Sequence, residues 1–87
     1  MSVSQQGQEI TARFFLAIDT LKNQGRLKSL RQFTQMYNLN YGNFYSIKTK
    51  SHIYILKPEL IASLCHDFGI SSEWILLGKG NLFSKDK

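Results

Sequence analysis

The chain has 87 residues, enough for one domain with a modest core, and its 43% hydrophobic and 13% aromatic residues exclude a disordered tail. A single cysteine, Cys65, excludes an internal disulfide and leaves no second thiol for a zinc site. The N-terminal residues lack the basic start and apolar stretch of a secretory signal, and no apolar run is long enough to span a bilayer, so we expect a soluble, cytoplasmic protein.

The net charge of +5 is distributed unevenly along the chain. Between Asp19 and Glu59 there are seven basic residues and no acidic one, whereas the rest of the chain carries four basic and six acidic residues. The seven are Lys22, Arg26, Lys28, Arg31, Lys48, Lys50 and Lys57. Helical surfaces usually mix both signs, so this acid-free segment predicts an anionic partner, most commonly nucleic acid; a solvated basic surface without a ligand is the alternative.

The first two predicted helices lie in the N-terminal half. Apolar residues in the segment 10–21 recur at helical spacing, and residues 23–25 end this first helix. Ser29 is followed three residues later by Gln32, which is the pattern of a capping box. It predicts a short second helix that stops at Asn38.

A sharp turn and a third helix follow. Asparagine tolerates the left-handed backbone that such a turn needs, which suits Asn38, and Leu39 fills the turn. Asn40 is a good N-cap, and apolar residues at every third position then predict a third helix over residues 41–49.

The C-terminal part contains two more predicted helices. Residues 53–56 are consecutively apolar and could be extended, but no second β-rich segment exists to pair with them, so the segment 50–57 is predicted to be a loop. Pro58 suits the first turn of a fourth helix that ends at Gly69. A fifth helix opens at residue 71 or 72 and stops at Gly78, after which residues 82–83 fold back.

The predicted fold is therefore all-α: a compact five-helix bundle containing a helix-turn-helix. We expect the domain to span residues 9–83, with flexible termini at 1–8 and 84–87. Within the motif, the inward residues are Phe33, Leu39, Phe44 and Ile47, and the outward ones are Asn40, Gly42, Asn43, Tyr45, Ser46 and Lys48. In such motifs the second helix lies in the major groove while the first crosses the phosphate backbone.

The run SLRQFTQMYNLNYGNFYSIK, from Ser29 to Lys48, resembles the helix-turn-helix of lambda-repressor-like (Cro/repressor, Xre-type) domains. The segment GISSEWILLGKGNLF at 69–83 resembles the closing pattern of phage repressor N-terminal domains. The resemblance implies sequence-specific binding of double-stranded DNA, often as a homodimer, and regulation of transcription. It also implies a capping role for Ser29 and base contacts from Tyr41, Gly42 and Ser46. Leu30 departs from the family's pattern, which has a bracing glutamine there.

The candidate DNA-binding residues are Lys28, Ser29, Arg31, Asn40, Tyr41, Gly42, Asn43, Tyr45, Ser46, Lys48 and Lys50. The basic members flank both motif helices, where phosphates would pass.

Three kinds of residue in the third helix leave alternatives open. Asn43 is the candidate for bidentate adenine recognition, or is simply solvated. The two tyrosines, Tyr41 and Tyr45, either reach sugar and phosphate or pack beside Phe44. Gly42 allows close approach of the backbone to DNA, or is merely tolerated in a short helix.

Other constellations carry no chemistry. His66 stands beside Cys65 and Asp67, but adjacent helical side chains point in different directions, so a triad or metal site is not expected and His66 is interpreted as a core-edge residue. Cys65 and Trp74 are interpreted as core. His52 could touch phosphate but is better explained as an exposed loop residue.

The residues 78–80, Gly-Lys-Gly, lack the hydroxyl residue and upstream glycine of a phosphate-binding loop. We therefore expect no enzyme, no cofactor, no metal, no membrane association and no small-molecule ligand. The alternative function is a protein-interaction module, such as an antitoxin or regulatory subunit, built on the same bundle. Any homodimer is expected to form through the bundle itself, for example through the fifth helix and tail.

Overall fold

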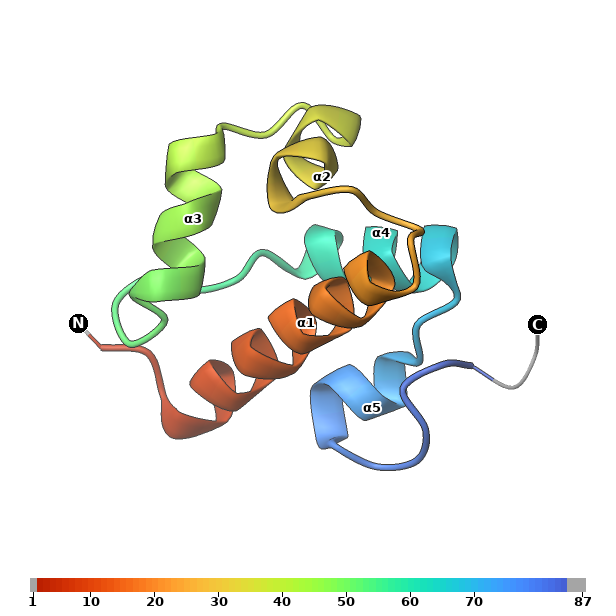
Figure 1. Ribbon diagram of the computed structural model, residues 1–87. Helices are drawn as coiled ribbons and strands as arrows, with labels where there is room; N and C mark the ends of the chain where they lie inside the picture. Colours follow the sequence, from red (N-terminus) through yellow and green to blue (C-terminus); the bar gives the residue numbers. More distant parts are fainter. Residues whose placement is uncertain (1, 85–87) are drawn as a thin grey trace.

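The longest helix, α1 (Gln5–Asn23), runs through the middle of the molecule in the computed structural model, which describes residues 2–84 (Figure 1). Its apolar stripe lies on one face and is buried from Phe14 to Leu21, while Ile10 at its start is half-buried. The helix begins four residues before the expected start of the domain, because the Ser4 hydroxyl accepts a hydrogen bond from the Gly7 amide at 3.1 Å and caps it. The expectation for residues 85–87 falls outside the described residues.

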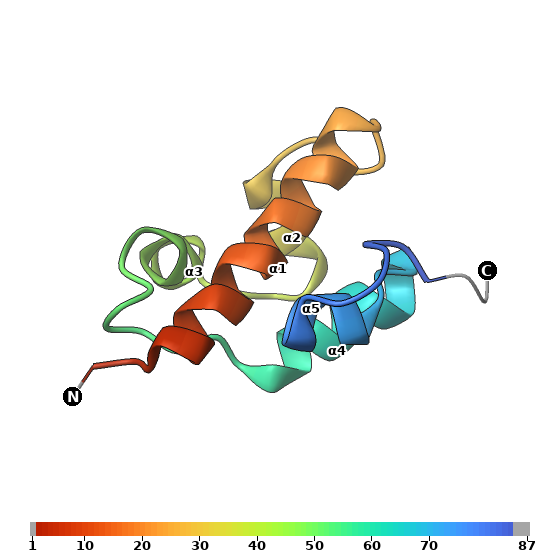
Figure 2. The same ribbon diagram turned by 90° about the horizontal axis from the view of Figure 1, so that it is seen from below.

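Four shorter helices pack around α1. They are α2 (Leu30–Met36), α3 (Tyr41–Thr49), α4 (Pro58–Phe68) and α5 (Ser72–Leu77). The predicted all-α bundle of five helices is confirmed, and the segment 50–57 is a loop as expected. Seen from below, α3 lies to one side of α1, while α4 and α5 lie together on the other side, and α2 passes behind α1 (Figure 2). No helix within residues 2–84 is long and apolar enough to cross a membrane.

The start of α2 carries the predicted cap with one difference. The Ser29 hydroxyl accepts a hydrogen bond from the Gln32 amide at 3.1 Å. The Gln32 side-chain oxygen reaches back to the amide of Lys28 at 2.7 Å, whereas a standard capping box would use the amide of the cap residue itself. Both ends of the reciprocal pair are thus satisfied, which stabilises a helix of only seven residues.

The turn between α2 and α3 is defined by one left-handed residue and two backbone hydrogen bonds. Asn38 adopts φ +55°, the one positive φ of a non-glycine residue within residues 2–84. The Leu39 amide donates to the Thr34 carbonyl at 2.8 Å, and the Asn38 amide donates to the Gln35 carbonyl at 3.4 Å. These two bonds form a Schellman motif, so the left-handed residue and the change of direction predicted at Asn38 are confirmed. The next helix then opens at its own cap, Asn40.

Three phenylalanines join α1, α2 and α3. The rings of Phe33 and Phe44 stack at 5.5 Å and 26°, and Phe14 meets both edge-on at 5.9 and 6.1 Å. All three are at most 2% exposed. Since the inner face of α3 is anchored to the two other helices through Phe44, its outer face is presented to solvent in a defined orientation.

The C-terminal part is closed by local turns and a return of the chain. Gly69 and Gly78 cap α4 and α5 in the left-handed conformation. The predicted fold-back is confirmed by an antiparallel bridge between Ile70 and Phe83. Cys65 and Trp74, which were expected in the core, are half-buried and pack against it from outside.

Candidate nucleic-acid interface

The candidate residues gather on and beside α2, the turn and α3. Eight of the eleven are exposed, and the other three, Ser29, Tyr41 and Ser46, are half-buried. Ser29 has its hydroxyl engaged in the cap of α2, which is the capping role that the resemblance implied. Of the four expected inward residues, Phe33 and Phe44 are fully buried, while Leu39 and Ile47 pack half-buried against the core.

The positive charge of the acid-free segment is not neutralised by ion pairs within residues 2–84. All seven basic residues between Asp19 and Glu59 are exposed, and none of them forms an ion pair with a carboxylate in the described part of the chain. Unpaired surface cations create a positive potential that attracts polyanions and is screened by salt. The uneven charge of the sequence is therefore preserved on the folded surface.

A cation–π contact followed by two stacked tyrosine rings links α2 to α3. The guanidinium carbon of Arg31 lies 4.1 Å from the centroid of the Tyr41 ring, and the Tyr41 ring lies 5.9 Å from that of Tyr45 with 23° between the planes. We call these three side chains the tyrosine stack. Tyr41 also packs against the core, whereas Tyr45 is 46% exposed, so the two tyrosines are used differently. The charge pattern did not reveal this contact, although tyrosines four residues apart on a helix are neighbours.

The two asparagines at the start of α3 have different chemical freedom. The side-chain oxygen of Asn40 accepts a hydrogen bond from the Asn43 amide at 2.9 Å, which confirms the predicted N-cap. The Asn43 side chain is exposed and makes no hydrogen bond within residues 2–84. Bidentate recognition of adenine needs both the oxygen and the NH₂ of one amide. Only Asn43 has both available.

The structure explains why glycine stands at position 42, and the explanation differs from those that the sequence suggested. A Cβ atom at this position would lie 3.3 Å from the cap oxygen of Asn40, which is tighter than ordinary van der Waals contact. The Ser46 hydroxyl donates to the Gly42 carbonyl at 3.0 Å. Glycine therefore leaves room for the cap, and Ser46, one turn further along α3, has its hydroxyl proton already engaged.

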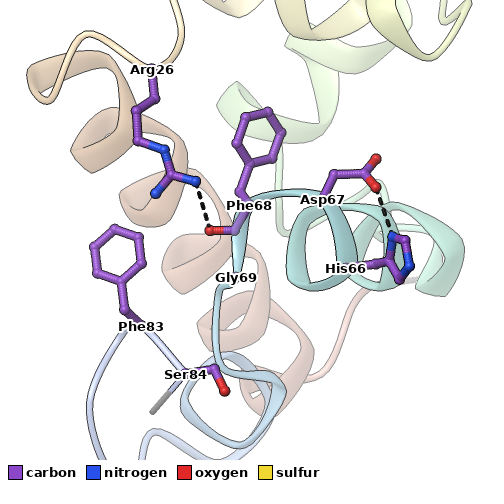
Figure 3. Close-up of a pocket in the computed structure, with 7 residues that line it drawn as sticks. All are labelled: Arg26, His66, Asp67, Phe68, Gly69, Phe83 and Ser84. Atoms are coloured by element: carbon purple, nitrogen blue, oxygen red, sulfur yellow. Dashed lines mark hydrogen bonds and ion pairs between the residues drawn. The ribbon is translucent and has the colours of Figure 1, made fainter. Parts of the chain in front are cut away.

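A separate hollow lies at the end of α4, away from α3, and Figure 3 shows its lining. Arg26 donates to the Phe68 carbonyl at 3.2 Å, and its guanidinium lies 5.8 and 5.7 Å from the rings of Phe68 and Phe83. This arginine of the acid-free segment thus holds the loop after α1 against the C-terminal turn. Its role in the fold could not be foreseen, because its partners lie more than 40 residues away.

Two expectations for the neighbouring histidine are wrong. The His66 side chain is 89% exposed rather than at the core edge, because it lies on the outer face of α4. Its Nδ1 atom also contacts a carboxylate oxygen of Asp67 at 2.8 Å, so these adjacent side chains do meet (Figure 3). Within residues 2–84 no group of three or more His, Cys, Asp or Glu side chains could hold a metal ion.

Asp67 also ties α4 to the end of α2. Its other carboxylate oxygen accepts a hydrogen bond from the Tyr37 hydroxyl. Hydrogen bonds from Tyr37 and His66 lower the pKa of the Asp67 carboxyl, and burial together with the Asp67 interaction raises the pKa of the Tyr37 hydroxyl. The link braces the helix that precedes the turn.

Exposed apolar side chains flank α3 on its C-terminal side. Ile53, Tyr54 and Ile55 are 50%, 47% and 69% exposed, and only Leu56 of this apolar run is buried. Together with parts of α3 they line a shallow hollow whose rim includes Lys57. The consecutive apolar residues were visible in the sequence, but their exposure was not.

Comparison of the chain with known protein families, with curated protein sequences and with solved structures found no match.

Proposed function

We propose that the chain is a sequence-specific double-stranded DNA-binding protein, a repressor-like transcriptional regulator that inserts α3 into the major groove. The observation that carries the proposal is the outer face of α3: exposed hydrogen-bonding side chains with no acidic residue, flanked by cations that form no ion pair within residues 2–84. The major groove of B-DNA is wide enough to admit an α-helix. The first helix of such a pair crosses the backbone.

The basic residues lie in two groups, and contacts from these groups to phosphates would fix the register of the protein on DNA. Lys28 and Arg31 lie at the start of α2, and Lys48 and Lys50 lie at the end of α3. Cations at both ends of the two-helix unit suit the two phosphate chains that border a groove. These contacts supply affinity for any sequence, and the exposed side chains between them supply selection.

A homodimer is part of the proposal. The nine residues of α3 extend over about 13 Å, which corresponds to about four base pairs. Specific regulators of this type combine two half-sites about 34 Å apart on a palindrome, because one half-site offers too few base contacts. A recovered palindrome in a selection from random duplexes would therefore report the two-fold symmetry together with the site.

The salt dependence of binding tests the proposal. If a dimer neutralises about eight phosphates, the logarithm of the binding constant falls with the logarithm of salt concentration at a slope of about −7. Fluorescence anisotropy on a mixed-sequence duplex measures this slope. No binding at low salt, or a flat slope, contradicts DNA binding.

Two substitutions separate phosphate contacts from base reading. Lys28→Ala is expected to weaken binding to all sequences alike and to flatten the slope, and Asn43→Ala is expected to lose about 1–3 kcal/mol only on the selected site. Lys79→Ala is the matched control, because this lysine is exposed but lies beyond α5. Equal losses for Asn43→Ala on selected and random DNA would exclude Asn43 as a reader.

One observation favours the second candidate, a protein-interaction module such as an antitoxin or regulatory subunit. The apolar run 53–55 is exposed beside α3, and exposed apolar clusters often mark protein contacts. The salt titration discriminates between the two, since an interaction module with no DNA ligand gives no counterion release.

A further inference from the structure

The outer face of α3 lacks the side chains that read G·C base pairs. From Asn40 to Ser46 the exposed or half-exposed residues contain no arginine, lysine, aspartate or glutamate; the first cation is Lys48, in the last turn of the helix. Guanine is read most often by arginine or lysine through O6 and N7, and the amino group of cytosine is read by carboxylates. Neither base therefore finds its usual partner on the first two turns of α3.

Arginine from the neighbouring helix does not replace the missing cation. The guanidinium carbon of Arg31 lies over the Tyr41 ring, 4.1 Å from its centroid, in a cation–π contact that holds the charge beside Tyr41. Arg31 also starts from α2, the helix that crosses the phosphate backbone in this arrangement. Its place in the interface is therefore with the phosphates.

The groups that are present suit A·T pairs instead. Asn43 has both its amide oxygen and its NH₂ group available, which is the combination that adenine N6 and N7 require. Ser46, the other small polar residue of this face, has its proton engaged by the Gly42 carbonyl and is left as an acceptor only. Asn43 is thus the principal hydrogen-bonding reader.

The tyrosine stack provides an apolar surface on the same face. The 5-methyl group of thymine projects into the major groove and is recognised by apolar contact. The Tyr45 ring is about half exposed and is held against Tyr41 at 5.9 Å, so it presents ring edges in a restricted orientation. Tyrosine offers a large contact area with few rotatable bonds, so little conformational entropy is lost when it binds.

We propose that α3 selects A·T base pairs in the major groove, taking adenine through Asn43 and the 5-methyl group of thymine through Tyr45 supported by Tyr41. This inference rests on the proposed function, since it specifies the sequence class that the same interface reads. It assigns the selection to base edges in the major groove and not to the narrow minor groove or the flexibility of A·T-rich DNA.

The experiment compares four duplexes of equal length and charge by fluorescence anisotropy at one salt concentration. The first is the A·T-rich site recovered by selection, and the second is the same site with every thymine replaced by deoxyuridine, which removes only the 5-methyl groups. The third carries G·C pairs at the read positions. The fourth carries inosine·C pairs there, which keep the major-groove pattern of G·C but have a minor groove like that of A·T.

We expect the A·T site to bind about tenfold or more tightly than the G·C duplex, because one bidentate pair discriminates by that factor. Deoxyuridine is expected to weaken binding by about fourfold for each contacted methyl group. The inosine duplex is expected to bind as weakly as the G·C duplex. Equal binding of the thymine and deoxyuridine sites, tighter binding of G·C, or inosine behaving like A·T each overturns the inference while DNA binding stands. No binding to any of the four overturns the proposed function itself.

Substitutions locate the methyl contact. Tyr45→Ala is expected to abolish the difference between the thymine and deoxyuridine sites, and Asn43→Ala is expected to reduce the preference for A·T over G·C. Leu16→Ala is the control, because Leu16 is 52% exposed against 46% for Tyr45 but lies on α1. Circular dichroism checks that each variant is folded. A full thymine preference in Tyr45→Ala would overturn the role assigned to this ring.

Discussion

The anchoring of α3 through Phe44 leads to a quantitative prediction for stability. Phe44 is 2% exposed, and its ring centroid lies between 5.2 and 6.1 Å from those of Phe14, Phe15 and Phe33. Replacing a buried phenylalanine by alanine costs about 3–5 kcal/mol, from lost burial and the cavity that remains. Because each of these ring pairs adds about 0.5–1.5 kcal/mol beyond burial, we expect the upper part of that range.

A loss of this size is a large share of the total stability. A domain of this length has a free energy of unfolding of about 4–13 kcal/mol, so Phe44→Ala should leave the chain marginally folded. Urea unfolding followed by circular dichroism measures the change, with the slope m unaltered if the denatured state is the same. Phe44→Leu restores most of the volume and is expected to recover more than half of the loss.

The neighbouring residue supplies the control. Tyr45 lies on the outer face of α3 and is 46% exposed, so Tyr45→Ala is expected to change the free energy of unfolding by about 0.5–1 kcal/mol. If Phe44→Ala cost less than about 1 kcal/mol, or if the two variants lost equal stability, α3 would not be anchored by Phe44 and the orientation of its outer face would be wrong.

Three further predictions concern contacts outside α3. Tyr37→Phe removes the hydrogen bond to Asp67. Because the pKa of Asp67 is lowered in the folded state, its contribution to the free energy of unfolding is lost as the pH falls below about 4. Because the pKa of Tyr37 is raised in the folded state, its contribution is lost as the pH rises above about 10. The urea midpoints of parent and variant should therefore differ most between those limits, and an equal difference at pH 3 and pH 7 would contradict the link. Asn38→Ala is expected to cost about 1–2 kcal/mol because of the positive φ, whereas Asn38→Gly should be nearly neutral; similar losses for both would exclude backbone strain as the cause. Arg13→Gln removes charged donors from two of the last carbonyls of α5, at 2.6 and 3.2 Å, and should cost about 1–2 kcal/mol in thermal or urea unfolding; an unchanged midpoint would show that these bonds do not stabilise the native state.

The boundaries of the helices follow from residues near in sequence. Ser29, Asn40 and Gly69 each make their capping interaction within four residues, so the chain pattern alone was sufficient to predict them. The left-handed turn at Asn38 has the same local origin. The number of helices and the loop at 50–57 were predicted correctly for this reason.

The particular surface of the candidate interface depends on how the helices pack. The contact between Arg31 and Tyr41 needs α2 and α3 to be placed side by side, and the bond from Arg26 to Phe68 joins residues 42 positions apart. No local pattern specifies such pairs. The exposure of His66 on the outer face of α4 also depends on how the helices pack, which is why the expected core-edge position was wrong.

Capping residues act over three or four positions, and charge composition is a sum along the chain. The acid-free segment, the turn at Asn38 and the third helix were therefore determined by the sequence alone. Tertiary packing alone determines which cations hold the fold: Arg26 donates to the Phe68 carbonyl, 42 positions away, although it is exposed to solvent like Lys28.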